Sequence, residues 1–143
     1  MTDNDYMKQA LAEARKAFAT DEVPIGAIIV CNGRIIARAH NLTETLNDVT
    51  AHAEMQAITA AAANIGGKYL NDCTLYVTVE PCPMCAGAIG WSQMGRVVYG
   101  ASDEKRGFMR YAPNVLHPKT KVTQGICADE ATALMKEFFS KKR

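Results

Sequence analysis

Hydrophobic and polar positions follow the helical period in some segments of this chain and the strand period in others. The first segment shows the helical period, since Tyr6, Leu11, Ala14 and Phe18 recur at helical spacing among polar residues. Other segments are short, apolar or alternating, and rich in β-branched residues, which is typical of strands. The pattern predicts helices over residues 5–19, 50–64, 83–94 and 128–140, and strands over residues 25–31, 34–38, 74–79 and 96–99.

Turn and capping residues mark where these segments begin and end. Asn32-Gly33 is a strong two-residue hairpin signal between the first two strands. We predict that Thr50 caps the second helix and that a glycine pair ends it. Residues 101–118 contain a glycine and two prolines and are predicted to be mostly loop. Strands interleaved with helices in this way predict a layered α/β fold.

Length and composition describe an ordinary folded chain. It has 143 residues, of which 48% are hydrophobic and 22% charged, and this predicts a single domain covering residues 1–143. No apolar run approaches the roughly 20 residues that a membrane span needs, and the acidic N-terminus lacks the order of a signal peptide. We therefore expect a cytoplasmic protein with no membrane partner. Its five cysteines are an odd number, and in that setting they indicate metal binding rather than a disulfide framework.

Charge is unevenly distributed along the chain, although the formal net charge is only +1. Residues 1–100 carry seven Lys/Arg against ten Asp/Glu, whereas residues 101–143 carry nine against five. The first part therefore has a net charge of −3 and the second a net charge of +4. A basic excess of this kind can bind phosphates. On charge alone, a solvated surface with a soluble tail is the favoured explanation.

The most informative chemical pattern joins a histidine and a glutamate to two cysteines further along the chain. His52 and Glu54 flank one alanine, and Cys82 and Cys85 lie in the run Pro-Cys-Pro-Met-Cys. Imidazole nitrogen and thiolate sulfur are ligands that zinc prefers, so these residues predict a site for one Zn²⁺ per chain. A zinc site with three protein ligands usually keeps a fourth position for water, which makes it catalytic.

The predicted helices place these residues close to helix N-termini. If Thr50 caps the second helix, His52 and Glu54 lie in its first turn. Pro83 is favoured at a first helical position, so the two cysteines lie at the start of the third helix. A helix N-terminus carries partial positive charge, which lowers thiol pKa values and favours the thiolates that zinc requires.

Glu54 separates the possible kinds of zinc site. Hydrolysis by a zinc-bound water needs a group that takes a proton from the water and returns it to the substrate and to the leaving group, and one carboxylate can do this. A structural zinc site or a redox Cys-x-x-Cys pair has no need of Glu54. A closed structural site would also need a fourth protein ligand, and the remaining candidates stand singly: Cys31, Cys73, Cys127, His40 and His117.

Longer stretches around these residues, spread through the whole chain, resemble those of a known protein family. They are residues 21–27 (DEVPIGA), Asn41, residues 50–54 (TAHAE), 75–82 (LYVTVEPC), 84–89 (MCAGAI), 95–101 (GRVVYGA) and 125–126 with the closing helix. The H-x-E and P-C-x-x-C pairing is itself the known motif of zinc nucleobase deaminases. The chain resembles the cytidine deaminase-like superfamily, and within it most closely the family of bacterial tRNA-specific adenosine deaminases.

This resemblance implies a fold, a reaction and a partner. The implied fold is a three-layer α/β/α sandwich with a mixed, roughly five-stranded sheet, usually present as a homodimer. The implied reaction is zinc-dependent hydrolysis of the wobble adenosine to inosine in a tRNA anticodon loop, with the anticodon stem-loop as the partner. By resemblance, His52, Cys82 and Cys85 would hold zinc and Glu54 would shuttle protons.

Further site residues are implied only by matching positions in the family. Asn41 would hydrogen-bond the flipped nucleotide, because its amide can both donate and accept. Ile25 and Gly26 would form a pocket wall, where glycine permits close approach. Asp103 and Lys105 match a loop beside the nucleic-acid strand.

The chain departs from the family pattern in two places. Residues 117–122 form a shorter stretch than in the better-known bacterial members, in a region that helps to grip RNA there. Pro83 and Trp91 instead resemble a run found in bacterial guanine deaminases. Since Trp91 falls well inside the third helix, we predict that it packs in the interior. We also predict that Phe138, Phe139 and the three remaining cysteines are core residues.

Two other functions remain compatible with the sequence. One is a deaminase of a free nucleobase or nucleoside, such as guanine or cytosine, which needs the same zinc chemistry without a phosphate-binding surface. The other is a non-catalytic binding module that zinc stabilises. The basic final third favours RNA over a free base, and Glu54 favours catalysis over a binding module.

Overall fold

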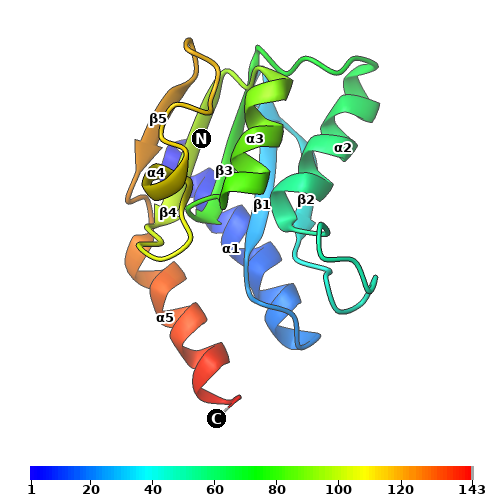
Figure 1. Ribbon diagram of the computed structural model, residues 1–143. Coiled ribbons are helices and arrows are strands. Elements are labelled where there is room, and N and C mark those ends of the chain that lie inside the picture. Colours follow the sequence, from blue (N-terminus) through cyan, green and yellow to red (C-terminus); the bar gives the residue numbers. More distant parts are fainter. Residues whose placement is uncertain (143) are drawn as a thin grey trace.

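The computed structural model describes residues 1–142 and contains one mixed sheet with helices on both faces (Figure 1). The sheet has five strands, and its middle strand is β3 (Cys73–Val79). The other strands are β1 (Gly26–Cys31), β2 (Arg34–His40), β4 (Arg96–Ala101) and β5 (Lys121–Gln124). The helices are α1 (Asp3–Ala19), α2 (Ala53–Ile65), α3 (Pro83–Ser92), α4 (Phe108–Tyr111) and α5 (Ala128–Ser140). The predicted three-layer α/β/α fold is confirmed.

Strand directions bring several chain segments to one end of the sheet. The strand order is β2-β1-β3-β4-β5, with β1 antiparallel to both neighbours and the remaining pairs parallel. Strands β2, β3 and β4 therefore end where β1 begins. We call this the C-terminal end of the sheet, and the other the opposite end. Ligand sites in open α/β sheets lie outside the carboxyl ends of strands.

The two faces of the sheet are covered by different helices. Ile28 and Val30 of β1 pack with Tyr6 and Met7 of α1, whereas the alternate residue Ile29 belongs to the core beneath α2 and α3. Helix α5 joins the face that α1 covers, through a cluster that also contains residues of β3 and β4. Because both faces are covered, β1, β3 and β4 are almost continuously apolar, which is usual for buried strands.

The predicted hairpin is confirmed, and both of its turn residues have positive φ. Asn32 has φ 51° and Gly33 has φ 75°, as a type I′ turn requires. The first helix starts at Asp3, because Thr2 and Asp5 form a capping box in which each side chain accepts from the other's backbone N–H.

Some predictions about local structure were wrong. Thr50 does not cap the second helix, because its N–H and hydroxyl both donate to Asp48 Oδ1, and α2 begins at Ala53 with His52 as N-cap. Residues 101–118 are mostly loop as predicted, although they contain the short helix α4, and β5 was not predicted at all. Trp91 is 86% exposed rather than interior, and Phe139 is also exposed.

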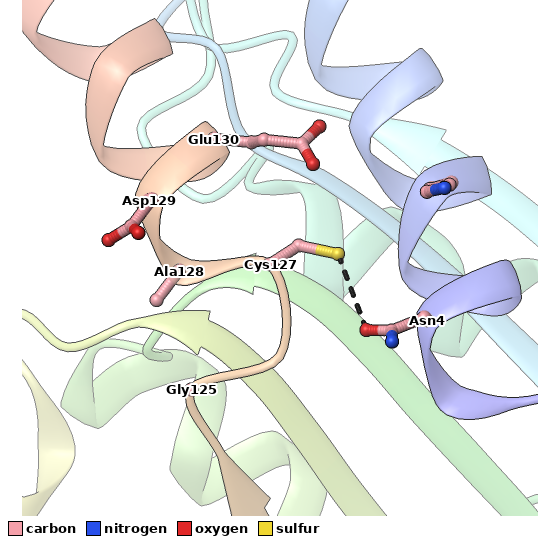
Figure 2. A pocket seen from close by; sticks show the side chains of 7 residues that line it. Asn4, Gly125, Cys127, Ala128, Asp129 and Glu130 are labelled. Carbon is pink, nitrogen blue, oxygen red and sulfur yellow. Dashed lines mark hydrogen bonds between the residues drawn. The ribbon is translucent and has the colours of Figure 1, made fainter.

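Helices α1 and α5 meet on the face away from α2 and α3. Figure 2 shows an open hollow there, in which Cys127 points toward Asn4 and its sulfur contacts Asn4 Oδ1 at 3.7 Å. Of the three cysteines predicted as core, Cys73 is buried, whereas Cys31 and Cys127 are half-buried. Within residues 1–142, none of the helices combines the length and apolar character that crossing a membrane requires.

Candidate active site

The structure brings His52, Cys82 and Cys85 together at the C-terminal end of the sheet. One potential ligand atom from each lies within 4.8 Å of the others. The distance from His52 Nδ1 is 3.6 Å to Cys82 Sγ and 3.5 Å to Cys85 Sγ. In the part of the chain that the structure describes, this is the one group of three or more such side chains with the spacing of a metal site.

Two helix starts create this cluster. His52 is the N-cap of α2 and Cys82 is the N-cap of α3, with Pro83 in the first turn as expected. Both N-caps have extended backbone, and neither side chain caps its own helix. The two side chains are therefore free to approach each other, at a point where both helix dipoles favour negative charge.

The electrostatics of the cluster fit a divalent cation. The pKa of the Cys82 thiol is lowered to about 4, chiefly by a hydrogen bond from Cys85 and further by His52 beside it. The pKa of Cys85 is raised in turn by its contact with Cys82 and by burial. Two adjacent thiolates repel each other, and a divalent cation bound to both would remove that repulsion. One imidazole and two sulfurs form a donor set that can hold a metal ion.

Glu54 lies beside the cluster in the first turn of α2 and is only 4% exposed. Burial raises the pKa of its carboxyl to about 7, although a hydrogen bond with its own backbone N–H opposes this. Its side chain lies against Cys85. A carboxyl group with a pKa near 7 can take up and release a proton at neutral pH, which is what general acid–base catalysis requires.

Asn41, Ile25 and Gly26 lie where β2 ends and β1 begins. Asn41 is 6% exposed, its N–H donates to the Ile25 carbonyl at 3.1 Å, and its Oδ1 accepts from Thr43 N–H at 3.4 Å. A Cβ added to Gly26 would collide with the backbone of α1. The close approach at Gly26 is therefore an approach to helix α1, on the face away from α2 and α3.

Asp103 and Lys105 lie in the loop that follows β4. Asp103 Oδ1 accepts the backbone N–H groups of Lys105 at 3.1 Å and Arg106 at 3.0 Å, so its carboxylate shapes the loop. Lys105 is exposed. Figure 1 shows this loop and the loop of residues 41–52 on either side of the start of α3.

Two buried glutamates hold these loops in place by hydrogen bonds, and the sequence analysis did not predict them. Glu22 is fully buried and accepts from Glu44 N–H at 3.0 Å and from Thr45 N–H and Oγ1, both at 2.6 Å. Glu80 is 7% exposed and accepts from Asp103 N–H at 3.0 Å and Met109 N–H at 3.1 Å. A buried carboxylate must be hydrogen-bonded, and here the partners are backbone N–H groups 22 to 29 residues away, which no local sequence pattern shows.

Comparison with known proteins shows the family of this chain. The MafB19-like deaminase family matches residues 1–143. A tRNA-specific adenosine deaminase of Bacillus subtilis (strain 168) is 46% identical over 146 residues, which cover 99% of this chain and 91% of the relative. A solved structure from studies of A-to-I editing by tRNA:A34 deaminases at the wobble position is 43% identical with a TM-score of 0.85, over 91% of this chain and 98% of the other.

Another solved structure is a guanine deaminase from Bacillus subtilis. It is 44% identical with a TM-score of 0.69, over 71% of this chain and 66% of the other. Fold and site together define a hydrolytic deaminase with the cytidine deaminase-like fold. Within that class, the chain belongs to the family of bacterial tRNA-specific adenosine deaminases.

Proposed function

We propose that this protein hydrolyses the wobble adenosine of a tRNA anticodon loop to inosine, acting in the cytoplasm. The observation that carries the proposal is the buried Glu54 beside the cluster of His52, Cys82 and Cys85, in a chain 46% identical to a tRNA-specific adenosine deaminase. The cluster and Glu54 support the chemistry, and the relatives support the substrate.

In this proposal His52, Cys82 and Cys85 hold one Zn²⁺ per chain. Zinc binds imidazole and thiolate together, and three protein ligands leave one position for water. When bound, zinc lowers the pKa of water from about 15.7 to about 7, so hydroxide is available at neutral pH. The two helix N-termini help by stabilising the deprotonated sulfurs.

Glu54 moves the protons of the reaction. Its carboxylate accepts a proton from the attacking water and delivers it to N1 of adenine as the water oxygen bonds to C6. It then carries the second water proton to the exocyclic amine, which leaves as ammonia when the C6–N bond breaks. The products are inosine and ammonia, and general acid–base catalysis of this kind contributes about 10²–10⁴ in rate.

The surrounding residues would position the nucleotide. The Asn41 side-chain amide would hydrogen-bond the flipped nucleotide, while Ile25 and the backbone of Gly26 would form a wall of the pocket. Asp103 and Lys105 would face the RNA strand on the other side. The same loop carries Arg106, and helix α4 after it carries Arg110, both exposed. Residues 101–111 thus hold three cations against two acids, and positive side chains that face outward suit a phosphate backbone better than a free base.

We also propose that the protein is a homodimer that pairs through the outer face of α3. Trp91 is 86% exposed and Met84 is 38% exposed on this helix, and Gly87 and Ala88 lie between them. An exposed tryptophan beside small residues is typical of a protein interface. Trp91→Glu should shift the protein from dimer to monomer in sedimentation, and a wild-type protein that sediments as a monomer would contradict the proposal.

The direct test is to measure inosine in RNA. The purified protein is incubated with an anticodon stem-loop that carries adenosine at the wobble position, and separately with free guanine, cytosine and adenosine. We expect inosine in the RNA and no turnover of the free compounds. Turnover of a free base without inosine in the RNA would reject the proposal in favour of a free-base deaminase, which the similarity to a guanine deaminase makes the second candidate.

A variant separates catalysis from metal binding. Glu54→Ala should abolish inosine formation while the bound zinc and the melting temperature stay close to those of the wild type. A wild-type protein that binds zinc but turns over none of the substrates would instead be a zinc-stabilised binding module.

A further inference from the structure

The loop that follows β4 presents an unusual surface beside the cluster. Residues 102–111, which include helix α4, carry the exposed cations Lys105, Arg106 and Arg110, the exposed acid Glu104 and two exposed apolar side chains. Met109 is 52% exposed and Tyr111 is 60% exposed. Both side chains lie in helix α4, and at this exposure they contribute little to the core.

Arg110 and Tyr111 form a pair whose polar groups are tied down. The Arg110 guanidinium lies 5.4 Å from the centre of the Tyr111 ring. The Tyr111 hydroxyl donates to the Lys105 carbonyl at 2.9 Å, and Arg110 Nη1 donates to the Glu104 carbonyl at 3.2 Å. The ring is therefore held in one orientation while most of its surface stays accessible.

The loop beneath this pair is fixed to the segment that carries Cys82. The Glu80 carboxylate accepts from the N–H of Asp103 and of Met109, and Phe108 N–H donates to the Pro81 carbonyl at 2.9 Å. A Cβ at Gly107 would collide with the Glu80 carboxylate, so glycine is what lets the loop approach so closely. The position of Tyr111 is thus set by the same strand end that positions Cys82.

We infer that Tyr111, backed by Arg110, is a stacking platform for an unpaired nucleotide next to the target base. Every base has a face that stacks on an aromatic ring, and a positive charge beside the ring attracts the phosphates. A ring already held in place loses little conformational entropy when a base stacks on it. This inference rests on the proposed function, because it requires single-stranded RNA at the cluster.

The chain contains a matched control pair at the other end of the sheet. Lys68 Nζ lies 5.3 Å from the centre of the Tyr69 ring, and Tyr69 is 49% exposed. These residues precede β3, whereas Cys82 follows it, so the control pair lies at the opposite end of the sheet. The two pairs share an exposed tyrosine and a cation, and they differ in their distance from the cluster.

The experiment compares how Tyr111 and Tyr69 affect RNA affinity and steady-state kinetics. Affinity for the anticodon stem-loop is measured in the Glu54→Ala background, and kcat and KM are measured with Glu54 intact. Tyr111→Leu should weaken RNA binding and raise KM by about 5- to 150-fold with little change in kcat. Tyr111→Phe should recover most of this loss because the ring remains, and Tyr69→Leu should behave as the wild type.

Salt dependence separates stacking from charge. Arg110→Gln should reduce the slope of log affinity against log salt by about 0.7, the value for one phosphate contact on single-stranded RNA. Tyr111→Leu should leave that slope unchanged. If Tyr111→Leu binds the stem-loop with an affinity and a KM within twofold of the wild type, while the wild type forms inosine, the stacking inference is overturned and the proposed function stands. If the wild-type protein forms no inosine in RNA, both are overturned.

Discussion

Carboxylates at the two ends of the sheet perform different tasks. At the C-terminal end, Glu22 and Glu80 are buried and accept hydrogen bonds from loop backbone N–H groups. At the opposite end, Asp3 is 31% exposed and pairs with the Arg96 guanidinium at 2.7 Å. Neither Glu22 nor Glu80 has a cationic partner within residues 1–142.

The difference shows how the site is built. An ion pair holds one side chain against another, as Asp3 does when it fastens the start of α1 to β4. A carboxylate that accepts two backbone N–H groups instead fixes the path of a loop. Glu22 fixes the loop between Asn41 and His52, and Glu80 fixes the loop after β4. At the C-terminal end, buried carboxylates thus position the backbone of loops. Burying them costs desolvation free energy, which the partly exposed Asp3–Arg96 pair largely avoids.

Replacing a buried cysteine should change bound zinc and activity at one end of the sheet and not at the other, and this is the largest contrast that we expect. Cys85 lies in the cluster and Cys73 begins β3 at the opposite end, and both are buried. Cys85→Ala should lose bound zinc and form inosine only at the background rate, because one of three protein ligands is gone. Cys73→Ala should keep one zinc per chain and its activity within about twofold. Plasma mass spectrometry of the metal and chromatography of digested RNA measure both.

Either variant can contradict the proposed ligand set. A Cys85→Ala protein with full zinc and normal inosine formation would exclude Cys85 as a ligand. Loss of zinc from Cys73→Ala, with the fold intact by circular dichroism, would show that the metal lies elsewhere.

Glu22→Gln is expected to have the next largest effect. Glu44 N–H and Thr45 N–H donate to different oxygens of Glu22, so the glutamine NH₂ would face one of them; that hydrogen bond is lost and a buried donor is left unpaired. This should lower the free energy of unfolding by about 1–3 kcal/mol. It should also raise KM for the stem-loop, because the displaced loop joins Asn41 to His52.

Urea unfolding and steady-state kinetics measure the two consequences. The matched control is Asp3→Asn, which should reduce stability without changing KM, since Asp3 touches no loop at the C-terminal end. If Glu22→Gln lost stability but kept the wild-type KM, Glu22 would support the fold alone and would not position the substrate.

Glu80→Gln tests whether the two loops are independent. Glu22 and Glu80 share no hydrogen-bond partner, so the free-energy changes in the double variant should add to within about 0.3–0.5 kcal/mol. Urea unfolding of the two single variants and the double variant gives the coupling energy. A coupling well above that range would mean that the two loops move together.

The sequence was sufficient for the elements and residues that carry a local signal. The ligand types in the H-x-E and P-C-x-x-C spacing predicted the cluster, and the apolar period predicted the four large helices and four of the strands. These signals are local because metal ligands and helical faces recur at fixed spacing. The fifth strand had no such signal, since Lys121–Gln124 is short and largely exposed at the edge of the sheet.

The remaining errors arose from tertiary partners that no local pattern shows. Thr50 resembles a helix cap, but the Asp48 carboxylate takes both of its donors, so the helix starts later at His52. Helix α3 is apolar all round, so its sequence could not show that Trp91 faces outward. Glu22 and Glu80 gave no signal of their roles because the amides that they bind lie 22 to 29 residues away.

The smallest expected effect is the pH dependence of the ion pair at the opposite end. Hydrogen bonds from Arg96, and a further one from Tyr76, lower the pKa of Asp3 below its ordinary value, although burial opposes them. A carboxyl whose pKa is lowered by folding stabilises the protein above its unfolded pKa, about 3.9, and loses that contribution as pH falls through the folded pKa. Asp3→Asn should therefore cost about 1 kcal/mol or less at pH 6. That cost should shrink toward zero near pH 3 in urea unfolding, and a cost that grows as pH falls would show that the pair does not stabilise through the ionised form of Asp3.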